Sequence, residues 1–102
     1  MKYGLEEQHL FEIINIIKSH PNVQEIILFG SRAMGNFRPG SDIDIALKGD
    51  QLQLKDVLKM SVEIDDLLIL NKVDLVIFHT ITETMLKDHI NRVGISLWKS
   101  PA

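Results

Sequence analysis

Residues 24–47 read QEIILFGSRAMGNFRPGSDIDIAL. The run Ile26–Phe29 is uninterrupted in its apolar character, which is typical of a strand covered on both faces. Residues 42–47 alternate Asp or Ala with Ile and Leu, the two-residue period of a second strand. Gly30 ends the first strand, because glycine accepts a positive φ and lets the backbone approach a ligand closely. The segment therefore predicts two strands joined through a glycine turn, with two carboxylates at the start of the second.

The rest of the chain predicts three helices and a third strand. Apolar side chains at helical spacing indicate helices over 5–19 and over 54–71. The almost wholly apolar run 73–78 predicts a strand, broken only by one acidic residue. The stretch 80–83 has the form of a capping box, and Gly94 is placed to end the helix that it opens.

This order of elements indicates the fold class. It predicts one α/β (α+β) domain over 1–102, with a single small mixed sheet of three to four strands packed against helices. The tail over 95–102 contains Leu97 and Trp98 and is open to two interpretations, a short edge strand or a docking segment.

Composition excludes several classes of protein. The chain has 102 residues, a net charge of −3 and no cysteine, so disulfides, thiolate metal sites and a cysteine nucleophile are excluded. Its 11 Lys and Arg residues are scattered, which argues against a nucleic-acid interface. No apolar run approaches the ~20 residues that span a bilayer, and the start MKYGLEE does not resemble a signal peptide. We therefore expect a cytoplasmic protein without a membrane partner.

Three carboxylates are candidate metal ligands. Asp42 and Asp44 are two apart on a strand, so they point to one face with Cα atoms separated by about 6.5 Å. Paired carboxylates suit hard cations such as Mg²⁺, and two ions can share such a site. Asp74 lies in the third strand, which we expect to be central or near-central. If that strand neighbours the second, Asp74 either binds the same cations or accepts a proton from an attacking hydroxyl.

The glycine turn complements these acids with groups that suit phosphate. Gly30 allows close backbone approach, and Ser31 is placed to cap the following short helix or to offer its hydroxyl. Arg32 and Arg38 are nearby cations able to clasp phosphate oxygens. Each feature also has a purely structural interpretation: a common strand-to-helix turn, the wet face of an edge strand, a buried carboxylate. The combination of all three features favours a catalytic site over these structural interpretations.

The histidines carry no such signal. No pair among them has metal-ligand spacing, so we expect ordinary surface or helix-end residues at positions His9, His20, His79 and His89.

The combined motif resembles a known family. Gly30-Ser31, ten intervening residues and Asp42-Ile43-Asp44 resemble the nucleotidyltransferase signature of the DNA polymerase beta superfamily. The fuller runs 30–35 and 38–45 are similar to the minimal nucleotidyltransferases (MNT) of bacteria and archaea. The similarity covers nearly the whole chain. Met34 departs from the commoner basic residue of the family, which removes one phosphate contact.

The resemblance implies roles for individual residues. Gly30 and Ser31 would bind the triphosphate of ATP or another nucleotide, and Arg32 and Arg38 match frequent arginines of the family. Asp42 and Asp44 would bind Mg²⁺, and Asp74 would be the third acidic residue of the site.

The resemblance also implies a partner. Minimal family members pair with a helical toxin of the HEPN (higher eukaryotes and prokaryotes nucleotide-binding) type. The expected function is that of a Mg²⁺-dependent antitoxin enzyme that transfers a nucleoside monophosphate, AMP from ATP, to a hydroxyl of that protein. The alternative is a weak or inactive nucleotide-binding module that acts by forming the complex. A third possibility, a transferase acting on antibiotics or other small molecules, needs an acceptor pocket made by a homo-oligomer.

Overall fold

The computed structural model describes residues 1–101. Its centre is a four-stranded mixed sheet in the order β3-β2-β1-β4. β1 pairs antiparallel with β2 and with β4, and β2 pairs parallel with β3. The strands are β1 (Glu25–Phe29), β2 (Ile43–Lys48), β3 (Val73–Ile77) and β4 (Ile95–Lys99). The structure confirms the predicted class, a small mixed sheet packed with helices.

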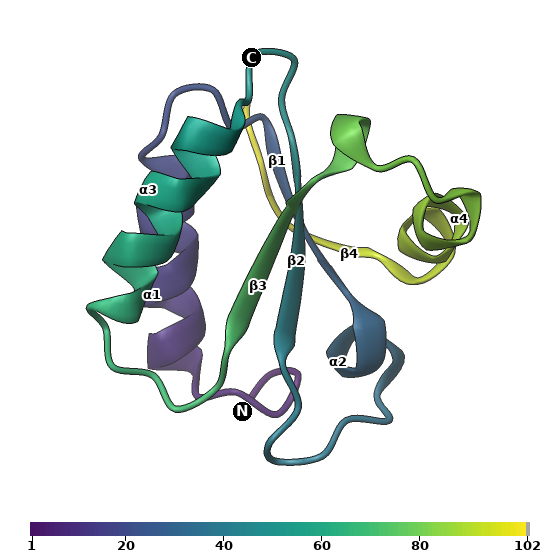
Figure 1. Ribbon diagram of the computed structural model, residues 1–102. Helices are drawn as coiled ribbons and strands as arrows, with labels where there is room; N and C mark the ends of the chain where they lie inside the picture. The colour runs from purple at the N-terminus through teal and green to yellow at the C-terminus, as the bar shows by residue number, and fades with distance from the viewer. Residues whose placement is uncertain (102) are drawn as a thin grey trace.

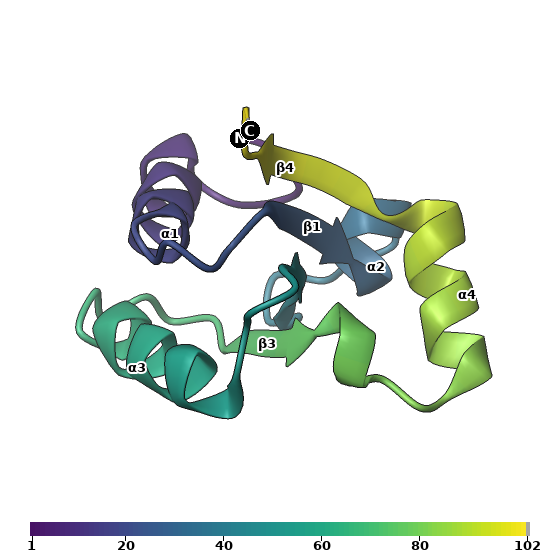
Figure 2. The same ribbon diagram turned by 90° about the horizontal axis from the view of Figure 1, so that it is seen from above.

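The helices lie in two pairs, one on each face of the sheet. Helices α1 (Glu7–Lys18) and α3 (Leu54–Asp65) cover one face, which we call the core face (Figure 1). Helices α2 (Gly30–Met34) and α4 (Thr84–Val93) lie on the opposite face, which we call the site face (Figure 2). No helix within residues 1–101 is both long and apolar enough to cross a membrane.

The core face contains the main hydrophobic cluster. Alternate strand residues point into it because successive side chains of a strand face opposite sides. Their neighbours are the apolar stripes of α1 and α3, such as Ile13 and Met60. The buried members of the cluster are Leu5, Leu10, Ile13, Ile17, Val23, Ile26, Leu28, Ile43, Ile45, Leu47, Leu52, Val57, Met60, Ile64 and Ile77.

The site face holds a much smaller cluster. Ile27 and Phe29 of β1, Ala46 of β2 and Ile90 of α4 are its buried members. It covers only the part of the sheet beneath α4, so the beginnings of β2 and β3 are left outside it. The acidic residues lie at those beginnings.

The second predicted helix is too long. α3 ends at Asp65 and not near Asn71. The Leu67 N–H bonds to the Ile64 carbonyl and the Leu68 N–H to the Asp65 carbonyl, which tightens the last turn into i→i+3 bonds. Leu68 then adopts a φ of 56°, which stops the helix. The apolar period misled because Leu67 still packs against the core cluster from the turn.

The predicted capping box at 80–83 is also wrong. Residues Phe78–Thr80 form a short 3-10 helix, η1, in which the Thr80 hydroxyl donates to the Ile77 carbonyl. α4 begins only at Thr84, although it ends before Gly94 as expected. The capping box of this chain is at α3 instead, where Gln53 and Asp56 exchange side-chain and backbone bonds.

The third strand is an edge strand, so the expectation of a central position is wrong. Among residues 1–101, β3 pairs only with β2, and its other edge has no strand neighbour. Its apolar run reflects cover on both faces, since Val73 and Leu75 pack against the core cluster and Val76 packs against the second hydrophobic cluster, on the site face. The tail resolves in favour of a strand, since β4 forms the other edge of the sheet with half-buried Leu97 and Trp98 against the core cluster.

Candidate functional site

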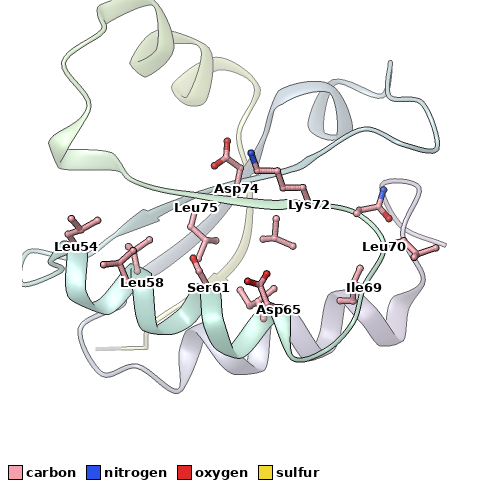
Figure 3. Close-up of a pocket in the computed structure, with 13 residues that line it drawn as sticks. Leu54, Leu58, Ser61, Asp65, Ile69, Leu70, Lys72, Asp74 and Leu75 are labelled. Atoms are coloured by element: carbon pink, nitrogen blue, oxygen red, sulfur yellow. The ribbon is translucent and has the colours of Figure 1, made fainter.

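Asp44 and Asp74 face each other across the β2–β3 boundary. They are direct partners in the parallel pairing, so their side chains leave the sheet on the same face. Figure 3 shows the Asp74 carboxylate pointing away from α3, while Leu75 points toward it. Asp42 precedes β2 by one residue, two positions before Asp44. The structure therefore gathers the three carboxylates at one corner of the site face.

The electrostatics of Asp44 reflect this crowding. Partial burial is the largest cause that raises its pKa, and the charges of Asp74 and Asp42 raise it further. The charges of His89 and Arg32 oppose that shift. A corner where carboxylates repel one another is one that gains from a bound cation.

Gly30 places the start of α2 directly beside Asp44. Its φ is 74°, a conformation that favours glycine. A Cβ atom built at Gly30 would collide with Oδ2 of Asp44 and lie 3.1 Å from its Cγ. The absent side chain thus makes the space in which the carboxylate sits. Gly35, with a φ of 84°, ends α2 with nothing near its missing Cβ.

Ser31 lies inside α2 and does not cap it. The capping position belongs to Phe29, which makes no side-chain cap bond. The Ser31 carbonyl accepts from the N–H groups of Gly35 and Asn36. Its hydroxyl makes no hydrogen bond within residues 1–101, so it is available to a ligand.

Arg32 is buried, with 1% of its surface exposed. Its guanidinium donates to the carbonyls of Tyr3 at 2.8 Å, Ser41 at 2.9 Å and Pro39 at 3.4 Å. It also lies 5.2 Å from the centre of the Phe37 ring. These contacts tie the N-terminal segment, α2 and the loop before β2 to one side chain. A phosphate contact of Arg32 stays a prediction, and these bonds favour a role in positioning the loop and α2.

Arg38 differs from Arg32 in almost every respect. It is exposed on the loop between α2 and β2, and its backbone N–H donates to Ser41 Oγ at 2.9 Å. Its guanidinium has no hydrogen bond or ion pair to any described residue. Of the two arginines, only this one is free to move toward an anion.

The three carboxylates suit Mg²⁺ by chemistry, since that ion prefers oxygen ligands and shares its sites with phosphates. Their mutual repulsion at Asp44 is a second reason. Across residues 1–101, however, no three His, Asp or Glu side chains converge closely enough to hold a metal ion. A metal role for these residues therefore remains a prediction.

A groove of about 640 Å³ lies between α3 and β3, on the other face of the sheet (Figure 3). Its walls combine apolar side chains such as Leu54 and Leu58 with polar ones such as Asp65. Asp74 lines its rim, but Asp42 and Asp44 do not. The groove is therefore separate from the corner where the carboxylates gather.

His89 is a member of this corner that the sequence analysis missed. It is half-buried on α4, and its Nε2 accepts the Gly30 N–H at 3.1 Å. The two residues are 59 positions apart, so no local motif connects them. The helical period of 84–93 indicates that His89 lies beside the buried Ile90 on α4. It contains no information that the ring lies over Gly30.

Comparison with known proteins adds a family to this geometry. The family model described as "Polymerase beta, Nucleotidyltransferase" matches residues 12–101. A candidate protein adenylyltransferase of Methanocaldococcus jannaschii is 45% identical over 47 residues. That match covers 44% of this chain and 47% of the relative, so it spans about half of the relative's length.

Two solved structures match nearly all of this chain. A crystal structure of a toxin-antitoxin with AMP-PNP has a TM-score of 0.72 and 28% identity, over 95% of this chain and 76% of the other. A structure of a tri-AMPylated Shewanella oneidensis HEPN toxin in complex with MNT antitoxin has a TM-score of 0.70 and 26% identity. This second match covers 94% of this chain and 74% of the other.

Proposed function

The chain belongs to the polymerase beta nucleotidyltransferase family, and on that premise we propose that it transfers AMP from ATP to a hydroxyl of a partner protein. The observation that carries the proposal is the pairing of Asp44 with Asp74 on the face where Gly30 begins α2. A candidate adenylyltransferase among its relatives supports the nucleotide and the reaction. The toxin-antitoxin structures support a HEPN-type protein as the acceptor, within a hetero-oligomer.

Each residue has a distinct part in this proposal. Asp42, Asp44 and Asp74 would supply the ligands of Mg²⁺, and the bound ion would neutralise phosphate charge and polarise the reacting phosphoryl group. The Gly30 N–H and the Ser31 hydroxyl bind phosphate oxygens, and Arg38 reaches them from its exposed loop. Arg32 holds the loop and α2 in place.

The bond changes follow from the substrate. The acceptor oxygen attacks the α-phosphorus, the bond from that phosphorus to the bridging oxygen breaks, and pyrophosphate leaves. The hydroxyl proton must pass to a base at the site. Asp42 and Asp74 are both exposed, but only Asp74 stands on an edge strand, where an acceptor can approach, so Asp74 is the base of this proposal when it is not a metal ligand.

Position-specific labelling of ATP tests this function. The chain is incubated with Mg²⁺, a HEPN-type partner and ATP labelled at the α-phosphate or at the γ-phosphate. We expect the α-label on the partner and the γ-label in released pyrophosphate. Asp44→Asn should reduce the labelling rate on the order of 10²–10³-fold, and Asp50→Asn, on an exposed turn, should leave it unchanged.

Two results would contradict the proposal. Transfer of the γ-label to the partner would indicate a phosphotransferase. Undiminished labelling by Asp44→Asn would remove the carboxylates from the chemistry.

A second candidate function is neutralisation of the partner by contact alone. The observation that favours it is the set of large apolar side chains exposed on α3, which are Leu54, Leu58 and Val62. Co-expression with the toxin separates the two functions. Growth rescue that survives the double change Asp42→Asn and Asp44→Asn would favour contact, whereas loss of rescue with the complex intact would favour AMP transfer.

A further inference from the structure

His89 joins α4 to the turn at the start of α2. Its Nε2 accepts the Gly30 N–H at 3.1 Å. Its ring meets the Phe29 ring edge-on, with centres 6.0 Å apart and planes at 78°. α4 itself packs against both α2 and β1. The imidazole is therefore held over the turn by a polar contact on one side and an aromatic contact on another.

The hydrogen bond fixes which ring nitrogen has the lone pair. A backbone N–H can only donate, so Nε2 must be the unprotonated nitrogen and the proton of the neutral imidazole lies on Nδ1. Nε2 thus occupies the acceptor position of the Gly30 N–H. Under the proposed function, that is the position of a phosphate oxygen.

The surroundings of the ring also point to an anion site. His89 lies close enough to Asp44 that a positive charge on its ring would lower the pKa of Asp44, as the charge of Arg32 does. Arg32 is already bonded to three carbonyls. Within the part of the chain that the structure describes, His89 makes a single hydrogen bond, to the Gly30 N–H, so of these two residues it is the one that can exchange its hydrogen-bond partner for a ligand.

We propose that His89 is a binding residue for the polyphosphate of the nucleotide, an inference that rests on the proposed function. Without nucleotide, its Nε2 satisfies the Gly30 N–H. With nucleotide, a phosphate oxygen takes over that N–H, and the imidazole donates its own N–H to the phosphate. A neutral imidazole exchanges its one proton between the two nitrogens, so Nε2 becomes a donor without a change in net charge.

Two other roles for His89 give different results. If the ring merely blocked the turn, its removal would strengthen nucleotide binding. If it only supported the fold, its removal would lower stability and leave affinity unchanged. A phosphate contact alone predicts weaker binding of any ligand that carries the polyphosphate.

Calorimetric titration of purified variants tests the proposal. The probes are an ATP analogue with a methylene between its α- and β-phosphorus atoms and inorganic tripolyphosphate, both with Mg²⁺. We expect His89→Ala to weaken binding of both probes about 10-fold, the scale of a hydrogen bond to a charged group. His79→Ala is the matched control, since His79 is exposed on η1, and should bind like the wild type.

Imidazole ¹⁵N spectra of the wild type provide a readout that needs no variant. Addition of tripolyphosphate should convert Nε2 of His89 from the unprotonated to the protonated form. Unchanged or tighter binding by His89→Ala, or an Nε2 signal that does not respond, overturns the role of His89. If the wild type binds neither probe, the proposed function fails and the role of His89 fails with it. If the wild type binds both probes and His89→Ala binds them equally well, only the role of His89 fails.

Discussion

The two faces of the sheet are built from the same strands but serve different ends. On the core face, α1 and α3 close over a continuous apolar cluster. On the site face, α2 and α4 bury only a small cluster and leave Asp44 half-buried and Asp74 exposed. Because strand residues alternate between faces, β1 and β2 contribute to both at once. The comparison suggests that stability depends mainly on one face and chemistry on the other.

Neighbouring residues of β1 provide the largest test of that division. Leu28 is fully buried on the core face, and Ile27 is buried in the small cluster of the site face. We expect Leu28→Ala to lower the free energy of unfolding by about 4 kcal/mol and Ile27→Ala by about 2 kcal/mol, since a closed cluster relaxes less around a cavity. Urea unfolding measures both. Equal losses would show that the faces contribute equally to stability.

The two arginines give the next comparison, within the site face itself, because Arg32 of α2 is buried and Arg38 on the following loop is exposed. Arg32→Met leaves the carbonyls of Tyr3, Pro39 and Ser41 without their guanidinium donor, and we expect a loss of about 3 kcal/mol. Arg38→Met, at an exposed position, should change stability by less than about 0.5 kcal/mol.

Nucleotide affinity completes that experiment. Arg38→Met should weaken binding of the methylene ATP analogue, while Arg32→Met, measured well below its unfolding temperature, should weaken it less. A larger loss of affinity in Arg32→Met than in Arg38→Met would indicate that Arg32 makes the phosphate contact.

Two glycines with nearly equal φ separate backbone strain from damage to the site. Gly30→Ala and Gly35→Ala both force alanine into a left-handed conformation and should cost about 1–2 kcal/mol each. Only at Gly30 does the new Cβ collide with Asp44. We therefore expect Gly30→Ala alone to abolish labelling of the partner. If Gly35→Ala abolished it as well, strain in α2 rather than contact with Asp44 would be responsible.

The smallest expected effect is a pH dependence of opposite sign on the two faces. Burial and neighbouring carboxylates raise the pKa of Asp44, so its favourable contribution to stability is present at low pH and lost as the pH rises through that pKa. The backbone bond at Gln53 lowers the pKa of Asp56, so its contribution is present above the ordinary carboxyl pKa of about 3.9 and lost below it.

Asparagine variants of Asp44 and Asp56 test these opposite pH dependences of stability. At neutral pH, Asp44→Asn should be more stable than the wild type and Asp56→Asn less stable. The first difference should shrink as the pH falls toward the raised pKa of Asp44, and the second should shrink only below the ordinary carboxyl pKa of about 3.9. Urea unfolding across that range measures them. A destabilised Asp44→Asn at neutral pH would show that the carboxylate already has compensating partners in the free protein.

The sequence predicted best where the signal is local. The alternation in β2 and the apolar run of β1 gave those strands, and Gly30 was identified as the end of the first. The helix end near Asn71 failed because Leu67 packs against the core from a turn, which the helical period does not distinguish. The expected central position of β3 failed because an apolar run reflects cover on the two faces of a strand and not pairing at its two edges.

Within the candidate site, the sequence predicted which residue types take part better than where they lie in the fold. The spacing of Asp42 and Asp44 placed them on one face, because a strand fixes that relation locally. Arg32 was expected at a phosphate, since its burial against distant carbonyls has no signature in the neighbouring residues. His89 was set aside for the same reason, as its partner lies 59 positions away.

The sequence by itself therefore determined the strands around the glycine turn, the mixed fold and the chemical types that gather near it. Only the tertiary structure decided that Asp74 stands opposite Asp44, that Arg32 is enclosed and that His89 covers Gly30. The physical reason is one of range. Side-chain period and glycine conformation act over a few residues, whereas strand pairing and helix packing join residues whose separation along the chain carries no pattern.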